Sequence, residues 1–227
     1  IVFLLFKPPE VRIVDESNPQ AFIESCTREA TEEALEFLSK RGGDISPKGY
    51  ITYNEDEITY LCYNERPYDK CVNQRPLLTE HIEKEIKNYI TPIVVECFDE
   101  LEFKLKDKYE VEESGLNVVT KLNSKSVSVE IQKNFKISKG DYVQNYDRFG
   151  MVLIHPIYDF SKIAMEIVNQ ESRFCNFDEL GFMIIYPEYD ITKFETGDSD
   201  VIYNLREIAS DESFTFAVKS CKLPQGY

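Results

Sequence analysis

The amino-acid sequence predicts an α+β protein in which N-terminal amphipathic helices pack on antiparallel sheets. Apolar residues recur near the 3.6-residue period of a helix in three stretches, at residues 18–41, 76–108 and 158–173. Between the second and third stretches, and again after residue 180, the period is close to two, which is typical of strands. After a first helix and a hairpin, the chain therefore has a helix plus a three-strand meander twice. Since no residue-level repeat accompanies this order, the likeness is architectural.

The first nine residues are expected to be the end of an N-terminal membrane or filament-core helix. An apolar run precedes Lys7, whose side chain would reach the lipid headgroups, and two prolines then end the helix. Six helical residues rise only about 9 Å, whereas a bilayer core requires roughly 20 apolar residues. We therefore expect the rest of the anchor to precede this sequence, and a buried strand or a fragment end is the alternative. The predicted anchor residues are Ile1, Val2, Phe3, Leu4, Leu5 and Phe6.

Residues 10–110 are predicted to form a helical part that contains a tyrosine-rich hairpin. Asn18 is a preferred N-cap residue, and Pro19 fits the first position of the helix that follows. Gly42 and Gly43 supply the signal that ends this helix. Its apolar side consists of Ile23, Cys26, Ala30, Ala34, Phe37 and Leu38.

A second helix is expected from Pro76 to about Lys108. Pro92 lies inside its apolar pattern, and because proline lacks an amide donor we expect a kink or a break near Thr91. The two helices should pack on each other through their apolar stripes.

The hairpin between the two helices is expected to pair residues 51–53 with 57–62 across a polar turn at 54–56. Tyrosine combines a large apolar face with a polar tip, so the tyrosines here are candidates for a contact surface. Ordinary cross-strand aromatic packing is the alternative. The predicted contact residues are Tyr53, Tyr60, Tyr63 and Tyr68, and Tyr50 belongs to the same cluster in the sequence.

Residues 111–227 are predicted to form an antiparallel β-rich part with one helix, from about Tyr158 to Arg173. Polar turns separate the strands on either side of this helix. The expected strands are residues 116–122, 126–137, 146–155, 181–193, 201–208 and 213–221.

Cysteines supply the evidence on compartment. There are 6, an even number, and no C-x-x-C pair is present, which excludes a zinc ribbon and a thioredoxin-type site. Disulfides are therefore predicted, although six buried thiols in a reducing compartment are the alternative. Sequence alone does not choose among the pairings. Position suggests that Cys62 and Cys71 close a compact loop, that Cys26 and Cys97 join the two helices, and that Cys175 and Cys221 pair by elimination.

The net charge of −15 argues against nucleic acid as a partner. We see no sequence motif of a metalloprotease, an α/β-hydrolase, a dinucleotide-binding fold or a P-loop, and His81 and His155 are interpreted as surface or half-buried residues rather than catalysts. No cofactor or metal is expected. The alternative is calcium at Glu195, Asp198 and Asp200, although this cluster lacks the spacing of an EF-hand and three acidic residues in a turn are usually only solvated.

Several short segments resemble poorly characterised exported proteins of DPANN archaea, in which an N-terminal apolar helix of pilin-like character precedes the folded part. The resemblance covers most of the chain and implies a single-pass or pilin-like extracytoplasmic protein; it implies no catalytic residues. The segments that carry it are 22–26, 33–35 with Leu38, 42–43, 82–97, 137–140, 157–159 with 167–168, and 214–218.

Together these observations predict a non-enzymatic extracytoplasmic protein of the cell surface. It would be anchored in the membrane, or assembled with like subunits as a homo-oligomer or filament, through its N-terminal helix. A ligand- or partner-binding ectodomain of a membrane complex is the first alternative. A hydrolase that uses two carboxylates is the second.

Overall fold

The computed structural model describes residues 18–196 and 199–221, so the predicted anchor and Asp198 lie outside the described part. Within it the chain forms an α+β fold, as the sequence predicts. The elements are α1 (Pro19–Lys40), β1 (Tyr50–Tyr53), β2 (Asp56–Tyr63), β3 (Val72–Asn73), α2 (Leu78–Leu105), β4 (Glu110–Asn123), β5 (Ser126–Lys139), β6 (Tyr142–Ile154), α3 (Ile157–Phe174), α4 (Glu179–Ile185), β7 (Tyr189–Glu195), β8 (Asp200–Glu207) and β9 (Ser213–Lys219).

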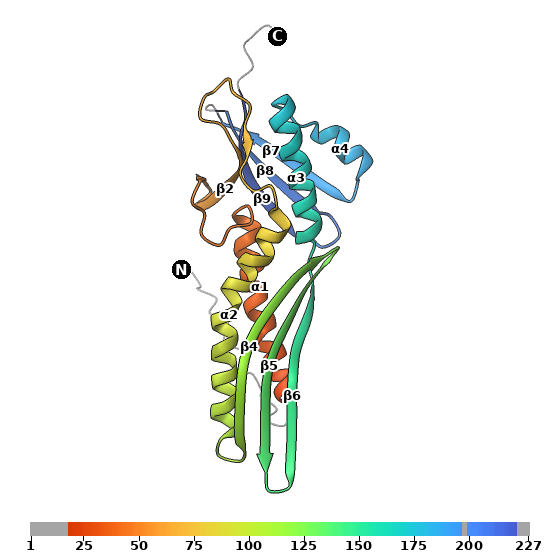
Figure 1. Ribbon diagram of the computed structural model, residues 1–227. Coiled ribbons are helices and arrows are strands. Elements are labelled where there is room, and N and C mark those ends of the chain that lie inside the picture. Colours follow the sequence, from red (N-terminus) through yellow and green to blue (C-terminus); the bar gives the residue numbers. More distant parts are fainter. Residues whose placement is uncertain (1–17, 197–198, 222–227) are drawn as a thin grey trace, which may run out of the picture.

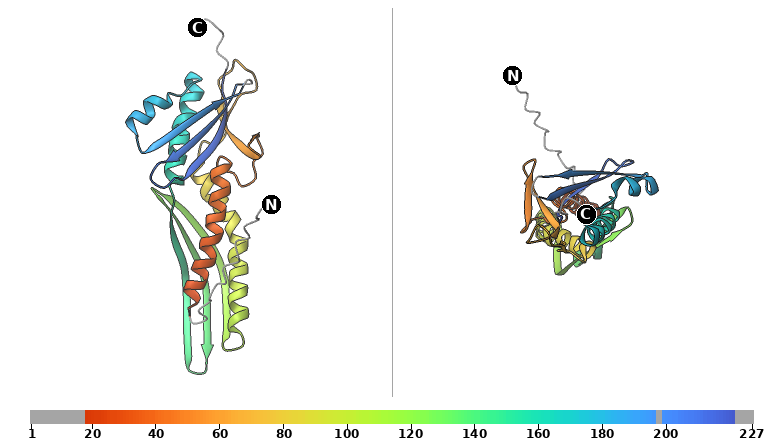
Figure 2. Two further views of the ribbon diagram at one scale, coloured as in Figure 1. Left: turned by 180° about the vertical axis from the view of Figure 1, so that it is seen from behind. Right: turned by 90° about the horizontal axis from the view of Figure 1, so that it is seen from above.

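Two sheets lie toward opposite ends of an elongated molecule (Figure 1). The long sheet has the order β4-β5-β6 and is antiparallel throughout. The mixed sheet has the order β1-β2-β9-β8-β7, with β3 beside β2, and its β2–β9 pair is parallel. Helices α1 and α2 run beside the long sheet, whereas α3 and α4 lie with the mixed sheet (Figures 1 and 2).

Helix α1 begins and ends as the sequence predicts. The Asn18 side chain accepts a hydrogen bond from the Ala21 amide at 3.2 Å, and Pro19 occupies the first turn. Gly42 and Gly43 follow the helix with φ angles of +69° and +88°, which favour glycine. A side chain at Gly43 would also lie about 3.1 Å from Ile82 of α2, so this turn brings the two helices into close contact.

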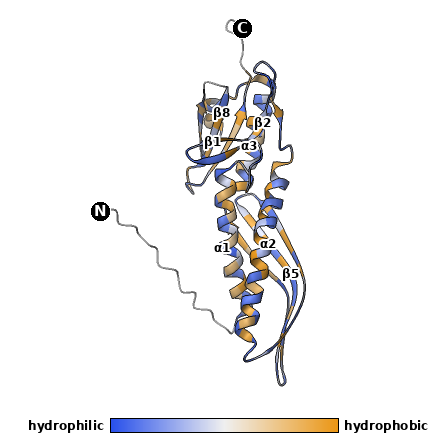
Figure 3. Ribbon diagram, turned by 90° about the vertical axis from the view of Figure 1, so that its left-hand side faces the viewer, coloured by the Kyte–Doolittle hydropathy of each residue, from blue (hydrophilic) through white to orange (hydrophobic). Residues whose placement is uncertain are grey.

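The main core begins between α1, α2 and the long sheet, where hydrophobic and hydrophilic residues alternate (Figure 3), and it continues between α3 and the mixed sheet. In the first of these parts, the ring centroid of Phe98 on α2 lies 5.8 Å from that of Phe135 on β5 and 5.1 Å from that of Phe149 on β6. All three rings are fully buried. Aromatic pairs at these separations add to the stabilisation that burial itself supplies.

Helix α2 runs without a break through Pro92, so of the predicted kink or break, the break into two helices is wrong. Proline removes one backbone hydrogen bond, here the one to the carbonyl of Asn88. The helix nevertheless keeps buried residues on both sides of this position, among them Ile90 and Val94, and their packing on the core outweighs the lost bond.

The strand predicted at residues 181–193 is also wrong in its first half. Residues 179–185 form α4, and β7 begins only at Tyr189. The Asp178 side chain accepts a hydrogen bond from the Gly181 amide at 3.0 Å and thereby starts the helix. Unlike a buried strand, α4 keeps large apolar side chains in solvent, and Ile184 is 82% exposed. The C-terminal part therefore has two helices rather than one.

A helix followed by a three-strand meander does occur twice, as α2 with β4–β6 and as α3 and α4 with β7–β9. The long strands extend further than predicted, because β4 begins at Glu110 and β6 at Tyr142. The two predicted parts, residues 10–110 and 111–227, are not separate in space, because β2 of the N-terminal hairpin pairs with β9 near the C-terminus.

The hairpin itself has a two-residue turn, in which Asn54 and Glu55 have φ angles of 49° and 74°. Left-handed angles at both positions match the twist of paired strands. The hairpin covers the outer face of the mixed sheet and forms a small second core there, in which Ile58, Ile202 and Ala217 are buried.

The six cysteines form three disulfides, in the pairing that their positions suggested. Cys26–Cys97 joins α1 to α2, Cys62–Cys71 closes the loop after β2, and Cys175–Cys221 joins the end of α3 to the end of β9. Paired cysteines of this kind are typical of proteins outside the reducing cytosol.

The disulfides should contribute unequally to stability. Cys26–Cys97 spans 71 residues and Cys62–Cys71 only 9, and a longer loop loses more entropy when it is closed in the unfolded chain. We expect Cys26→Ala with Cys97→Ala to lower the free energy of unfolding by about 4 kcal/mol, and the equivalent change at Cys62–Cys71 by about 2.5 kcal/mol. Urea denaturation of both double variants measures the difference, and the reverse order would contradict this assignment.

Candidate functional site

The largest concentration of tyrosine lies along a groove beside β2, which we call the tyrosine groove. It encloses ≈ 640 Å³, within the range of known ligand sites. Segments from four parts of the chain form its walls, so it exists only after the mixed sheet has assembled. The lining residues are Lys48, Gly49, Tyr50, Thr59, Tyr60, Tyr63, Gln74, Arg75 and Lys219.

Two of the four predicted contact tyrosines meet in this groove. The rings of Tyr60 and Tyr63 pack edge to face, with centroids 5.3 Å apart. The Tyr60 hydroxyl donates a hydrogen bond to Asp200 Oδ1 at 2.9 Å, and burial together with this carboxylate raises the pKa of Tyr60. Tyr60 is therefore held in one orientation, whereas the Tyr63 ring stays partly exposed.

The other two predicted contact tyrosines lie elsewhere. Tyr53 packs against Phe194, with ring centroids 5.3 Å apart, beside the second core. Because β1 and β7 are not neighbours in the sheet, this is aromatic packing within the fold but not the cross-strand packing of a hairpin that was the alternative interpretation. Tyr68 lies on the loop closed by Cys62–Cys71 and is 72% exposed. The structure thus brings Tyr60 and Tyr63 together but not all four.

Three basic side chains complete the groove, and the sequence did not reveal them. They are Lys48, Arg75 and Lys219, and no acidic residue is among the described residues that line it. The Lys219 ammonium lies 5.3 Å from the centroid of the Tyr63 ring, within reach of a cation–π interaction. The groove is therefore aromatic and cationic, although the chain as a whole is strongly acidic.

A buried carboxylate, Asp44, fixes the floor of the groove. It is 5% exposed and accepts hydrogen bonds from Thr59 Oγ1 at 2.9 Å and Arg75 Nη2 at 3.2 Å, and His81 Nε2 lies 2.7 Å from it. Burial alone would raise the pKa of Asp44, but the hydrogen bonds and the positive charge of Arg75 outweigh burial and lower it. Asp44 therefore orients the guanidinium that lines the groove.

The same region contains the one group in the described residues with the composition of a metal site. Donor atoms of Asp44, His81 and Glu85 lie within 4.8 Å of one another. His81 and Glu85 are one helical turn apart on α2, which places both on one face. Protein donors already engage these carboxylates, because the Ile45 amide donates to Glu85 Oε2 at 3.0 Å. The hydrogen-bonded network accounts for this cluster without an ion.

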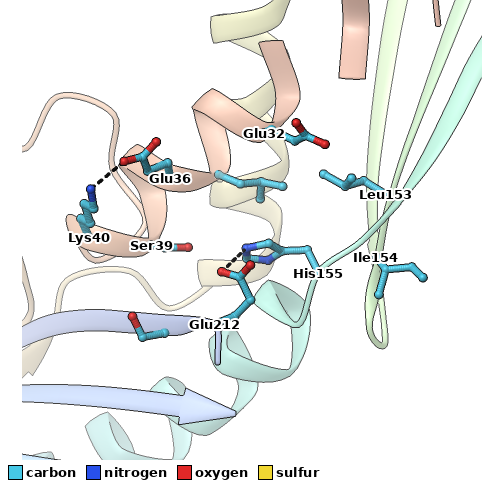
Figure 4. Close-up of a pocket in the computed structure, with 10 residues that line it drawn as sticks. Glu32, Glu36, Ser39, Lys40, Leu153, Ile154, His155 and Glu212 are labelled. Carbon is cyan, nitrogen blue, oxygen red and sulfur yellow. Dashed lines mark hydrogen bonds and ion pairs between the residues drawn. The ribbon is translucent and has the colours of Figure 1, made fainter. Parts of the chain in front are cut away.

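A second pocket lies at the junction of the two sheets, between α1, the end of β6 and the start of β9, and encloses ≈ 380 Å³ (Figure 4). His155 is buried beside it. The Ile157 amide donates to His155 Nδ1 at 3.1 Å, and Nε2 faces Glu212 at 3.4 Å. With both ring nitrogens engaged, His155 is not placed to activate Ser39 or Ser213, the two hydroxyls of this pocket.

Burial lowers the pKa of His155, and the nearby carboxylates Glu212 and Glu207 oppose this effect only in part. The His155 amide donates to the Lys125 carbonyl at 3.1 Å, beside the end of the β5–β6 pair, whereas its ring faces Glu212 just before β9 of the mixed sheet. Its position supports a structural role at the junction, and the interpretation of a surface or half-buried residue fits His81 better than His155.

A further buried acid, Glu171 of α3, was not predicted to be buried, although it continues the apolar stripe of the helix, three residues after Val168 and four after Ile167. It accepts hydrogen bonds from the Tyr203 hydroxyl and from Ser220 Oγ, the latter at 2.7 Å. Burial and the adjacent Glu171 raise the pKa of Tyr203. Together with Cys175–Cys221, these bonds hold the end of β9 against α3.

The predicted calcium residues are occupied by other contacts where the structure describes them. Asp200 is buried and accepts the bond from Tyr60, whereas Glu195 pairs with Lys193 at 2.9 Å. Asp198 lies outside the described residues. Glu195 and Asp200 are thus engaged in structural contacts of the mixed sheet.

Removal of the Asp44 charge should destabilise the fold. Asp44→Asn leaves Arg75 without its carboxylate partner, and we expect the free energy of unfolding to fall by about 2 kcal/mol at pH 7. Because the pKa of Asp44 is lowered, its contribution should also disappear as the pH falls below 3.8. Asp141→Asn, at an exposed turn, is the control and should change stability by less than about 0.5 kcal/mol.

His155 should make stability depend on pH. The unfolded chain protonates this histidine near pH 6.5, whereas the folded chain does so only at lower pH. Between these values the unfolded state binds more protons, so the free energy of unfolding should fall as the pH decreases, by up to about 1.4 kcal/mol per pH unit.

Thermal unfolding from pH 7 to 5 would measure this dependence. His155→Gln should flatten the dependence of stability on pH. Glu212→Gln removes a carboxylate that raises the pKa of His155, so this variant should extend the dependence to lower pH. An unchanged slope in His155→Gln would show that other groups cause the effect.

Comparisons of the chain with known protein families, with curated protein sequences and with solved structures find no match. The resemblance to exported proteins of DPANN archaea therefore stays a prediction from the sequence.

Proposed function

We propose that this protein is a non-enzymatic, extracytoplasmic surface protein that acts in surface structure or adhesion. The observation that carries the proposal is the complete pairing of its six cysteines. Each disulfide joins segments that the fold has already brought together, and such crosslinks persist in oxidising surroundings. In this role the disulfides maintain the fold outside the cell, and the tyrosine groove supplies the contact surface.

The elongated shape supports a role in which one end is attached and the other makes contacts. Helix α1 begins beside the end of α2, where the Lys104 ammonium lies 4.7 Å from the centroid of the Phe22 ring. The mixed sheet lies toward the other end (Figure 1), and its strands β2 and β9 contribute residues to the tyrosine groove. Attachment through the segment before α1 would therefore direct the groove away from the point of attachment.

We propose further that residues 1–6 belong to the attaching segment, in a membrane or in the core of a pilin-like filament of like subunits. This part of the proposal rests on their apolar sequence alone, because these residues lie outside the described part. Among the described residues, no helix combines the length and the hydrophobicity that crossing a membrane requires.

A second candidate function is a ligand-binding ectodomain of a membrane complex. The tyrosine groove favours it, since its volume and its mixture of aromatic and charged side chains are those of a binding site. The two functions differ in whether copies of this chain contact one another. Electron microscopy and light scattering of material isolated from its native membrane or surface would separate a filament from a complex with other subunits.

The intact mass of the native protein tests the extracytoplasmic proposal. Under denaturing conditions without reductant we expect alkylation of none of the 6 cysteines, and after reduction alkylation of all of them. Six alkylated thiols before reduction would place the protein in a reducing compartment and contradict the proposal. Protein that is oxidised only during purification is excluded by adding the alkylating reagent at the moment of lysis.

A further inference from the structure

We propose that the tyrosine groove binds an oligosaccharide that carries carboxylate or sulfate groups. This inference names the ligand class of the contact surface in the proposed function and rests on that function for its biological setting. The arguments come from the charge, the aromatic geometry and the strand pairing of the groove.

The charge of the groove is opposite to that of the protein. The chain carries a net charge of −15, yet its lining residues include Lys48, Arg75 and Lys219 and no acid. Among the described residues, Lys48 and Lys219 have no ion-pair partner, and only Arg75 is paired, with Asp44. Two ammonium groups are thus available to an anionic ligand, and the guanidinium is fixed beside them.

Three acids, Asp44, Asp200 and Glu57, are bonded to residues of the groove but are not among the residues that line it. Asp200 is buried and already accepts the hydrogen bond from Tyr60. Glu57 bonds to the Tyr50 hydroxyl and raises the pKa of Tyr50. These two carboxylates hold tyrosines in place and keep their charge, but it is the three cations that line the groove.

The aromatic side chains supply the apolar part of recognition. Tyr60 and Tyr63 lie edge to face, and the Tyr63 side chain is 37% exposed. The apolar C–H faces of a sugar ring pack on such surfaces, while the tyrosine hydroxyls and Gln74 offer hydrogen bonds to its polar edge. Lysine ammonium groups at the rim are suited to carboxylate or sulfate substituents.

Strand pairing argues against an extended peptide as the ligand. Peptides commonly add a strand to an open sheet edge. Here β2 pairs with β1 and β3 along one edge and with β9 along the other. Along β2, recognition must therefore use side chains. Single-stranded nucleic acid would also suit aromatic and basic groups, but the net charge of −15 repels a long polyanion.

Isothermal titration calorimetry of the oxidised protein tests this inference. The ligands are tetragalacturonate and a heparin tetrasaccharide, compared with cellotetraose, a tetraglutamate peptide and a thymidine tetranucleotide. We expect one of the two charged oligosaccharides to bind at least about tenfold more tightly than cellotetraose, with affinity that falls as salt is added.

Matched variants locate the site. Lys48→Gln with Lys219→Gln should weaken binding about tenfold. The control, Lys84→Gln with Lys87→Gln, makes the same change of net charge at exposed positions of α2 and should leave affinity unchanged. Tyr63→Leu should weaken binding about fivefold, whereas Tyr63→Phe, which keeps the ring, should retain it. Near-UV circular dichroism verifies that each variant is folded.

Three outcomes would overturn the inference: equal affinity for cellotetraose, tighter binding of the peptide or the oligonucleotide, or equal loss in the control variant. Failure of the ligand assignment is distinct from failure of the proposed function. Reduced thiols in the native protein would contradict export while binding in the groove persisted, and intact disulfides without binding would remove only the ligand assignment.

Discussion

The fold depends on α1 being buried along its length between elements from distant parts of the chain. It packs on α2, on β6 of the long sheet and on β9 of the mixed sheet. Cys26–Cys97 adds a covalent link to the first of these contacts, and Gly43 allows the chain to turn tightly against α2. One helix thereby contacts both sheets and the second long helix.

This arrangement connects the core to the tyrosine groove. The turn that ends α1 leads directly to Asp44, whose carboxylate orients Arg75 from below the groove. On the opposite wall, Asp200 orients Tyr60. Two of the lining side chains, Arg75 and Tyr60, are therefore oriented by buried acids, so that a ligand would lose little free energy in ordering these two. The overall acidity of the chain does not describe this local surface.

The sequence predicted the elements well where burial is periodic, as in α1, α3 and the long strands. It failed at α4, because a short apolar run such as residues 182–185 fits a strand as well as a helix, and the cap at Asp178 decided the outcome. The parallel pairing of β2 with β9 and the network of Asp44, Thr59, Arg75 and His81 could not be predicted. These groups come from separate segments, and no local pattern links them.

The pairing of β2 with β9 also constrains the order in which the chain is able to fold. The Asn64 side chain, just after β2, donates to the carbonyl of Ser220, 156 residues later. Contacts of such long range form slowly, because a large loop must close before they are made. While β9 is still being synthesised or translocated, the matching edge of β2 has no partner, and the Cys62–Cys71 loop is the one crosslink that short-range closure favours. The groove is therefore a late product of folding, and an incomplete chain would lack it.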